Sequence, residues 1–146
     1  MTTTTASADE LKEFIRATLV EPPGQLNKEL IKLCEGLITI DTQSKTVRVI
    51  NSKVTDKEKV VLLCLGYWIL SYFLDAPSVS DVTRETLEKG LAIDAKTVSA
   101  YASTLKQDML LETTSRGTYR ARLPRMLDFF RGVRKKLGLT TDQKGE

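Results

Sequence analysis

The chain has 146 residues, 41% of them hydrophobic and 28% charged, a balance that is ordinary for a folded globular protein and argues against disorder along its whole length. It contains no histidine and only two cysteines, which removes the commonest general base near neutral pH and leaves too few soft ligands for a structural zinc site. The net charge of +3 is concentrated, since residues 95–137 carry ten basic and three acidic side chains, as a surface that binds a polyanion requires.

These features also narrow the class of function. The sequence has no glycine-rich phosphate loop, no metal-ligand cluster and no carboxylate pair in a recognisable setting. We therefore expect a protein that is not an enzyme and needs no cofactor or metal. Cys34 and Cys64 fall inside predicted helices, and buried reduced thiols are typical of an intracellular protein. A cytoplasmic or nucleoid-associated location follows as an expectation.

The first third of the chain is predicted to be an extension. Residues 1–8 form a threonine-rich tail that lacks the charged and apolar blocks of a signal peptide. Apolar residues at helical spacing, followed by β-type runs around a polar loop, predict two helices and a hairpin. Their ranges are 9–20, 26–35, and 37–40 paired with 46–50. Pro22-Pro23-Gly24 ends the first helix, and the extension is expected to end near residue 53.

A long apolar helix is predicted next. Thr55 and Glu58 have the spacing of a capping box, and the helix is expected to stop near Leu74, because Pro77 follows. Its apolar run is shorter than a membrane span, so we predict the spine of a core and no membrane contact. The expected core positions are Val60, Val61, Leu63, Cys64, Tyr67, Trp68, Leu70 and Phe73. An apolar surface on this helix could also serve a dimer interface.

Two further helices are predicted at residues 82–91 and 95–107, joined by a turn at Ala92-Ile93-Asp94. Asp94 is a good N-cap for the second of them. Within that second helix one apolar stripe recurs at i, i+3, i+4 and i+7, which leaves small, polar and basic residues on the other faces. The stripe consists of Val98, Tyr101, Ala102 and Leu105.

A hairpin and a last helix complete the pattern. Residues 109–112 and 118–123 are predicted strands around a turn at 113–117, and Pro124 opens a helix over 125–137. Strand alternation places Tyr119, Ala121 and Leu123 on one face and Thr118, Arg120 and Arg122 on the other. The basic residues near the end of the last helix complement its dipole in the simplest interpretation. They are Arg131, Arg134, Lys135 and Lys136. Residues 138–146 are expected to be a flexible tail.

Over residues 54–137 this order of elements resembles the winged helix-turn-helix transcriptional regulators. The helix-turn-helix core is matched by Glu85-Thr86-Leu87 through Ile93-Asp94 to Lys96-Thr97-Val98-Ser99, and the wing by Arg116-Gly117-Thr118-Tyr119. Two residues depart from the family pattern: Ala92 and Met109 stand where glycine is frequent. The resemblance implies a mainly α, α+β fold, namely a winged helix with an N-terminal helical extension and a β-hairpin.

The resemblance further implies a dimeric regulator that binds double-stranded DNA. The helix 95–107 is expected in the major groove, and the basic wing 113–123 on the phosphate backbone or in the minor groove. The predicted contact residues are Lys96, Thr97, Ser99, Ala100, Ser103, Lys106, Arg116, Arg120 and Arg122.

Two alternatives remain open at this level. Winged helices also serve as protein–protein interaction modules within larger assemblies, and the apolar long helix or the N-terminal hairpin could supply that contact. In addition, residues 9–53 could be a degenerate first copy of the same unit, because Cys34-Glu35-Gly36-Leu37-Ile38 parallels Gln107-Asp108-Met109-Leu110-Leu111 ahead of each hairpin. An independent helical extension is the preferred interpretation.

Overall fold

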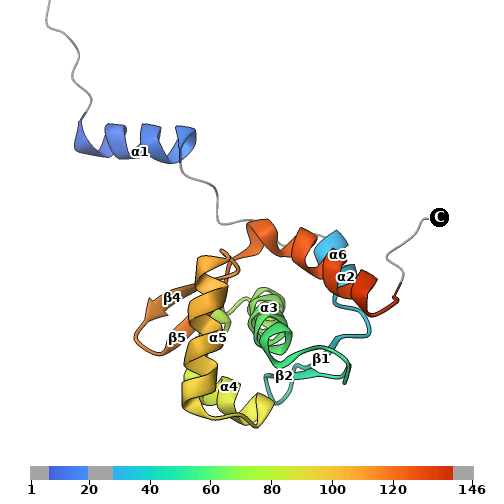
Figure 1. The fold of residues 1–146 in the computed structure, drawn as a ribbon. Coiled ribbons are helices and arrows are strands. Elements are labelled where there is room, and N and C mark those ends of the chain that lie inside the picture. The colour runs from blue at the N-terminus through green and yellow to red at the C-terminus, as the bar shows by residue number, and fades with distance from the viewer. Residues whose placement is uncertain (1–6, 20–27, 140–146) are drawn as a thin grey trace, which may run out of the picture.

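The computed structural model describes residues 7–19 and 28–139, and within them the chain has an α+β fold of helices and two small antiparallel sheets (Figure 1). The helices are α1 (Ala8–Thr18), α2 (Lys28–Leu33), α3 (Asp56–Leu74), α4 (Arg84–Leu91), α5 (Ala95–Gln107) and α6 (Met126–Lys136), with 3-10 turns η1 (Pro77–Ser80) and η2 (Leu123–Arg125). The strands are β1 (Ile38–Asp41), β2 (Thr46–Val49), β3 (Val82–Thr83), β4 (Leu111–Ser115) and β5 (Thr118–Ala121). Most of the predicted tails, and Pro22-Pro23-Gly24, lie outside the described residues.

Helix α3 occupies the centre of the molecule, and Figure 1 looks along it with the other elements arranged around it. Its start is the predicted capping box: the Glu58 N–H donates to Thr55 Oγ1 over 3.2 Å, and the Thr55 N–H donates to Glu58 Oε1 over 2.8 Å. Every side chain from Val60 to Leu65 is buried. A helix that is buried all round must be covered on all sides, which explains its unbroken apolar sequence.

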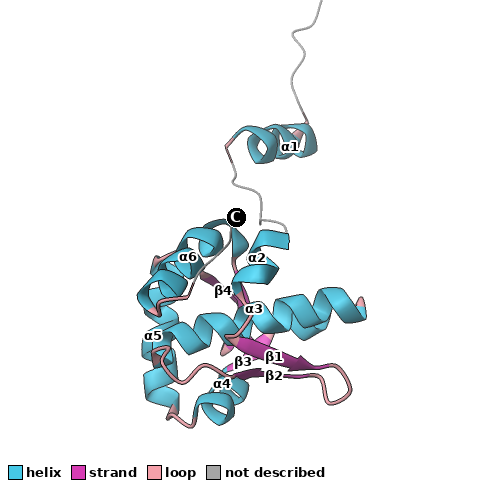
Figure 2. Cartoon of the chain, turned by 90° about the vertical axis from the view of Figure 1, so that its right-hand side faces the viewer, coloured by secondary structure: helices cyan, strands magenta, loops and turns pink. Residues whose placement is uncertain are grey.

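The last turn of α3 differs from the prediction. Phe73, expected in the core, is 70% exposed, and its neighbour Tyr72 is 75% exposed. Tyr67 and Trp68 are half-buried. Figure 2 shows α3 extending at one end beyond the elements that cover its middle. Apolar periodicity locates a helix but not the point at which its neighbours stop, so this last turn could not be distinguished from the buried part.

The N-terminal segment from α2 onward shares the core of the rest of the chain. Leu30, Leu33, Leu37 and Val47 are buried in the same apolar cluster as the residues of α3, α5 and α6. Strand β2 lies so close to α3 that a Cβ on Gly66 would come within 2.4 Å of Val47 Cγ1. Residues 28–53 are therefore packed into the body of the protein.

Helix α1 is different, because none of its described side chains is buried. Figures 1 and 2 both show it standing apart from the other helices. Its start is again a capping box, formed by Ser7 and Glu10. Because α1 stands apart and α2 has only 6 residues, the described part of the segment 9–53 contains no packed helix pair like α4 and α5. Within its described residues the segment therefore does not repeat that unit.

The second sheet has the order β3-β5-β4, with all neighbours antiparallel. Strand β3 was not predicted, since residues 82 and 83 were assigned to the start of a helix. Val82 pairs with Tyr119, and Thr83 is the N-cap of α4, accepting a hydrogen bond at Oγ1 from the Thr86 N–H over 3.1 Å. A strand of two residues is too short to show an alternating pattern.

Candidate nucleic-acid interface

Helices α4 and α5 are joined by a tight turn. Ala92 caps α4 in the left-handed region with φ 54°, and Asp94 caps α5 by accepting the Thr97 N–H at Oδ1 over 2.8 Å. Hydrogen bonds from the Thr97 hydroxyl and N–H lower the pKa of Asp94 below its ordinary value. The hydroxyl of Thr97, a predicted base contact, is therefore directed at the cap of its own helix, and Thr97 is half-buried.

The two positions at which glycine was expected have the backbone that glycine favours. Ala92 has φ 54° and Met109, between α5 and β4, has φ 65°. A residue with a Cβ pays about 1–2 kcal/mol to adopt this conformation. Both positions therefore have a left-handed backbone although neither residue is glycine.

Helix α5 has two distinct sides. Val98, Ala102 and Leu105 are fully buried, as the stripe predicted, while Tyr101 is half-buried. The opposite side follows the spacing i, i+4, i+7 and i+11, so its residues lie in one row. This outer row consists of Lys96, Ala100, Ser103 and Gln107, all exposed. Ser99, half-buried, and Lys106, exposed, lie on one flank of the row.

Strands β4 and β5 form a hairpin beside α5 (Figure 1). Its turn is shorter than predicted, because β4 continues to Ser115 through a register shift between Thr113 and Ser115. Gly117 takes φ 73°, and Arg116 is exposed at the tip. The predicted alternation is confirmed in burial: the inward face is fully buried and the outward face is half-buried.

Arg120 has an intramolecular partner that the sequence did not reveal. Its Nε and Nη2 donate to Asp81 Oδ1 over 3.0 and 2.8 Å. Asp81 directly precedes β3, and the pairing of Val82 with Tyr119 brings these two neighbours together. The ion pair fastens β3 to β5, so one predicted phosphate contact is engaged within the fold. The 39 positions between the two residues explain why a local pattern missed it.

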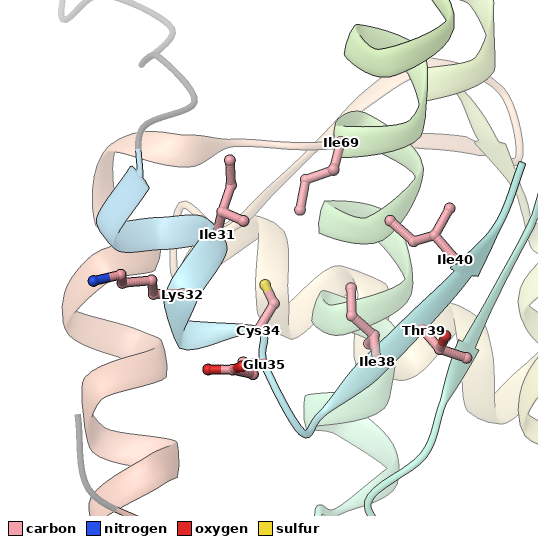
Figure 3. Close-up of a pocket in the computed structure, with 8 residues that line it drawn as sticks. All are labelled: Ile31, Lys32, Cys34, Glu35, Ile38, Thr39, Ile40 and Ile69. Atoms are coloured by element: carbon pink, nitrogen blue, oxygen red, sulfur yellow. The ribbon is translucent and has the colours of Figure 1, made fainter. Parts of the chain in front are cut away.

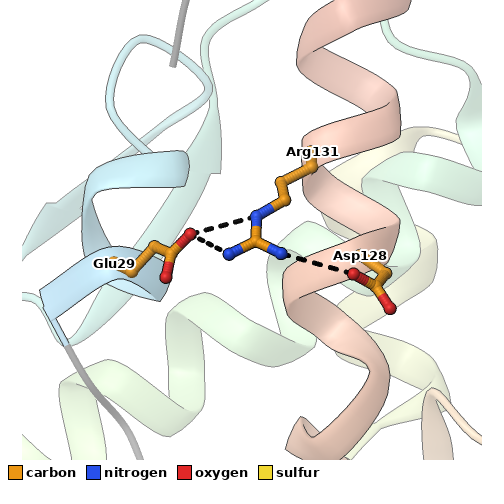
Figure 4. Close-up of polar contacts among 3 residues, drawn as sticks. All are labelled: Glu29, Asp128 and Arg131. Atoms are coloured by element: carbon orange, nitrogen blue, oxygen red, sulfur yellow. Dashed lines mark hydrogen bonds and ion pairs between the residues drawn. The ribbon is translucent and has the colours of Figure 1, made fainter. Parts of the chain in front are cut away.

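Three of the four basic residues on α6 are also engaged, which replaces the simple dipole interpretation. Figure 4 shows Arg131 between two carboxylates: its Nε donates to Glu29 Oε2 over 3.0 Å, and its Nη1 to Asp128 over 3.4 Å. The hydrogen bond to Glu29 is the main reason why the pKa of Arg131 is raised. Glu29 lies on α2, so this guanidinium joins the first and last helices of the core.

Arg134 and Lys136 make the other two connections. Arg134 Nη1 donates to the carbonyl oxygens of Leu33 and Glu35 over 3.2 and 2.6 Å and so satisfies the end of α2. Lys136 pairs with Glu58 at the start of α3. Burial pushes the pKa of Glu58 upward, but the hydrogen bonds from Lys136 and Thr55 outweigh it and lower the pKa overall.

The remaining basic side chains of this region lack acidic partners. Within residues 7–19 and 28–139 no ion pair involves Lys96, Lys106, Arg116 or Arg122. These four residues belong to α5, to the tip of the hairpin and to the segment directly after β5. Figure 1 shows α5 and the hairpin adjacent to each other on one side of α3, with α2 and the β1–β2 hairpin on the other. The structure thus places four of the nine predicted site residues on α5 and on or directly after the adjoining hairpin, without ion pairs among the described residues.

Other kinds of site find little support among the described residues. No group of three His, Cys, Asp or Glu side chains in that part of the chain could hold a metal ion. Burial raises the pKa of both Cys34 and Cys64 to about 12, which keeps them protonated and unreactive. None of the helices described is long and apolar enough to cross a membrane.

Comparisons with protein-family models, with curated proteins and with solved structures find no match to this chain. A functional assignment therefore rests on the residues and geometry described above.

Proposed function

We propose that this chain is a winged-helix protein that binds double-stranded DNA and regulates transcription. In this proposal α5 enters the major groove with its outer row, and the β4–β5 hairpin is the wing, with Arg116 and Arg122 near the phosphate backbone. Lys106, on the flank of α5, adds a third phosphate contact. Arg120 positions the wing through Asp81 rather than contacting DNA.

The order of elements supports this assignment. From α3 to α6 the chain runs helix, strand, two helices joined by a tight turn, a two-stranded hairpin and a helix, and β5 lies between β3 and β4. This arrangement holds the hairpin beside the second helix of the helix-turn-helix, where a wing is expected. The outer row of α5 contains Ala100 and Ser103, whose small side chains would allow the helix to lie deep in a groove.

The single observation on which the proposal rests is the distribution of basic side chains with and without polar partners in the fold. Four basic residues in this third of the chain, Arg120, Arg131, Arg134 and Lys136, are engaged by carboxylates or carbonyls, while Arg125 and Lys135 are exposed and have no ion pair among the described residues. Those on α5 and at the tip and base of the wing are left without acidic partners. A fold that neutralises several of its charges internally but leaves four basic side chains unpaired on one helix and the adjoining hairpin is suited to an external polyanion.

The test is a titration of random duplex DNA at two salt concentrations, followed by fluorescence anisotropy. The triple variant Lys106→Gln, Arg116→Gln, Arg122→Gln should bind all duplexes more weakly, and the slope of log affinity against log salt should fall by about 0.9 for each phosphate that the variant no longer neutralises. A matched control removes three exposed lysines away from this face, namely Lys28→Gln, Lys53→Gln and Lys135→Gln. It has the same net charge and should keep the parental slope.

Groove reading is tested in the same assay by Ala100→Glu, which places a carboxylate on the outer row opposite the buried stripe. The fold should survive, because exposed substitutions usually change stability by no more than about 0.5 kcal/mol, and binding should be lost. Thr42→Glu adds the same charge in the β1–β2 turn, on the other side of α3, and should bind like the parent. No DNA binding by the parent at low salt, or unchanged binding by both sets of variants, would favour the interaction-module alternative.

A further inference from the structure

The structure leaves two apolar surfaces of the same chain uncovered. The first is the apolar stripe of α1, defined by Leu11, Phe14 and Ile15 together with Leu19 directly after the helix. All four are exposed, and Phe14 reaches 66% and Leu19 78%. Their spacing places them on one side of the helix. A side of this kind is stable in water only when it docks on another apolar surface.

The second surface is a groove between α2, α3 and β1, with a volume of about 510 Å³. Figure 3 shows Ile31 of α2, Ile69 of α3 and Ile38 and Ile40 of β1 directed toward the same space. Phe73, 70% exposed, follows Ile69 by four positions on α3 and so lies on the same side of that helix. The groove is thus lined by four isoleucine side chains and Cys34, with Lys32, Glu35 and Thr39 as its polar lining residues.

We propose that α1 of one copy docks in the α2–α3–β1 groove of a second copy, and that reciprocal exchange forms a two-fold symmetric homodimer. Each surface has the shape and chemistry that the other lacks: a narrow apolar stripe on a helix and an apolar groove. Exchange between copies leaves neither surface open, because a two-fold operation applies every contact twice.

The linker favours a second copy over folding back, and symmetry enlarges the contact that such a dimer buries. In the single chain both surfaces stay open, although the nine residue steps from Leu19 to Lys28 could span up to about 30 Å. The connecting sequence contains Pro22 and Pro23, which disfavour a tight reversal. A helix of 11 residues, about 16 Å long, is small for a stable interface by itself. Doubling by symmetry brings the contact toward the size of specific interfaces.

This inference does not depend on DNA binding, and its test uses no DNA. The full chain is examined by sedimentation velocity over a range of concentrations. The parent should be a dimer, and Phe14→Glu and Ile31→Glu should each raise the dissociation constant about 100-fold, because each would bury an unpaired carboxylate. Both residues are exposed in the single chain, so circular dichroism and thermal melting at low concentration should show folded variants.

A control variant and a mixing experiment test whether the dimer forms by reciprocal exchange of α1. Asp9→Asn changes a residue on the opposite side of α1, two positions before Leu11, and should leave the dimer intact. A mixture of Phe14→Glu and Ile31→Glu should form more dimer than either variant alone, because the hybrid retains one native contact between helix and groove. A monomeric parent, dimers that persist in both glutamate variants, or a mixture with no added dimer would overturn the proposal.

Discussion

At the scale of single residues, Gly66 shows how close packing between two elements fixes a residue type. Gly66 lies in the middle of α3, where helix propensity disfavours glycine by about 1 kcal/mol relative to alanine. Its hydrogen faces Val47, whose Cγ1 would stand 2.4 Å from an added Cβ. Val47 is buried and β-branched, so it cannot turn aside at low cost. The close approach of β2 to α3 therefore requires glycine at this position.

Gly66→Ala should consequently destabilise the protein, by about 1–3 kcal/mol, because overpacking outweighs the gain in helix propensity. Gly132→Ala in α6 is the matched control, since a Cβ there meets nothing within 4 Å. That variant should be more stable than the parent by about 0.5–1 kcal/mol. Urea unfolding of the two variants measures both signs. A stabilised Gly66→Ala variant would mean that β2 does not rest on α3 as described.

The ion pair of Arg120 and Asp81 is a residue-scale feature that the sequence does not reveal. A solvated arginine on the outer face of a strand is indistinguishable in sequence from one that binds a carboxylate. Here the pairing of β3 with β5 decides the matter, because it places the two side chains at neighbouring positions on adjacent strands. The residue type could be predicted to matter, but its partner could not.

At the scale of elements, α6 holds the ends of the core together. Arg131 and Arg134 reach α2, and Lys136 reaches the first turn of α3. Glu58 has two tasks there: it accepts the Thr55 N–H as half of the capping box, and it pairs with Lys136. Its side chain is only 12% exposed, so the two interactions occur in a partly desolvated place where charge matters more.

Glu58→Gln separates the two tasks, because glutamine can still accept the capping hydrogen bond but carries no charge. The folded-state pKa of Glu58 lies below the ordinary value of 4.5, so the carboxylate stabilises the folded state above about pH 4.5 and loses that effect as the pH falls through the lower folded-state pKa. The parent should exceed the variant in unfolding free energy at pH 7, and the gap should close toward pH 3.

Denaturant unfolding across this pH range provides the measurement. Lys136→Met serves as the control: in that background Glu58→Gln should change stability much less at pH 7, because the charged partner is already gone. A gap that is independent of pH would show that the carboxylate charge contributes nothing and that only the cap matters.

At the scale of the whole molecule, the two sides of α3 carry different surfaces. One side presents α5 and the β4–β5 hairpin, where Lys96, Lys106, Arg116 and Arg122 have no ion pair among the described residues. The other presents α2 and β1, with the apolar groove proposed as the dimer contact (Figures 1 and 3). If both proposals hold, a dimer formed on the second side leaves the first side of each copy free for a duplex.

The sharing of one core predicts how the chain tolerates truncation. Deletion of residues 1–19 removes side chains that are all exposed where described, so at low micromolar concentration the melting temperature should stay within a few degrees of the parent. Deletion of residues 1–53 removes Leu30, Leu33, Leu37 and Val47 from the core. At about 1.5–3 kcal/mol for each large buried aliphatic side chain, this loss rivals the whole stability of a small domain.

The longer deletion should therefore fail to fold cooperatively, even though it starts at the predicted domain boundary and retains α3–α6. Thermal melting by circular dichroism compares the two fragments. A cooperative transition for residues 54–146 near the parental temperature would show that the N-terminal segment is dispensable and that the boundary predicted near residue 53 separates independent units.

Local signals in the sequence were sufficient for several features whose deciding interaction lies within about four residues. The capping box at Thr55 and the N-cap at Asp94 indicated where α3 and α5 begin, and the bounds predicted for those helices agree with the structure. The apolar stripe of α5 and the alternation of β5 correctly identified their buried sides. The caps are satisfied by neighbours in the chain, and the stripe and the alternation repeat at a local period, so each pattern is visible without knowledge of the fold.

Tertiary structure alone decided what depends on residues far apart in the chain. It paired the two-residue strand β3 with β5, left Phe73 uncovered, and packed α2 and β2 into the core. It also decided which basic side chains have partners. Arg120, Arg131, Arg134 and Lys136 bind carboxylates or carbonyls 39 to 102 positions away. The basic residues on α5 and at the tip of the β4–β5 hairpin have no ion pair among the described residues. The residue type sets the charge of a side chain. Whether that charge is neutralised depends on which groups lie near it in the folded chain.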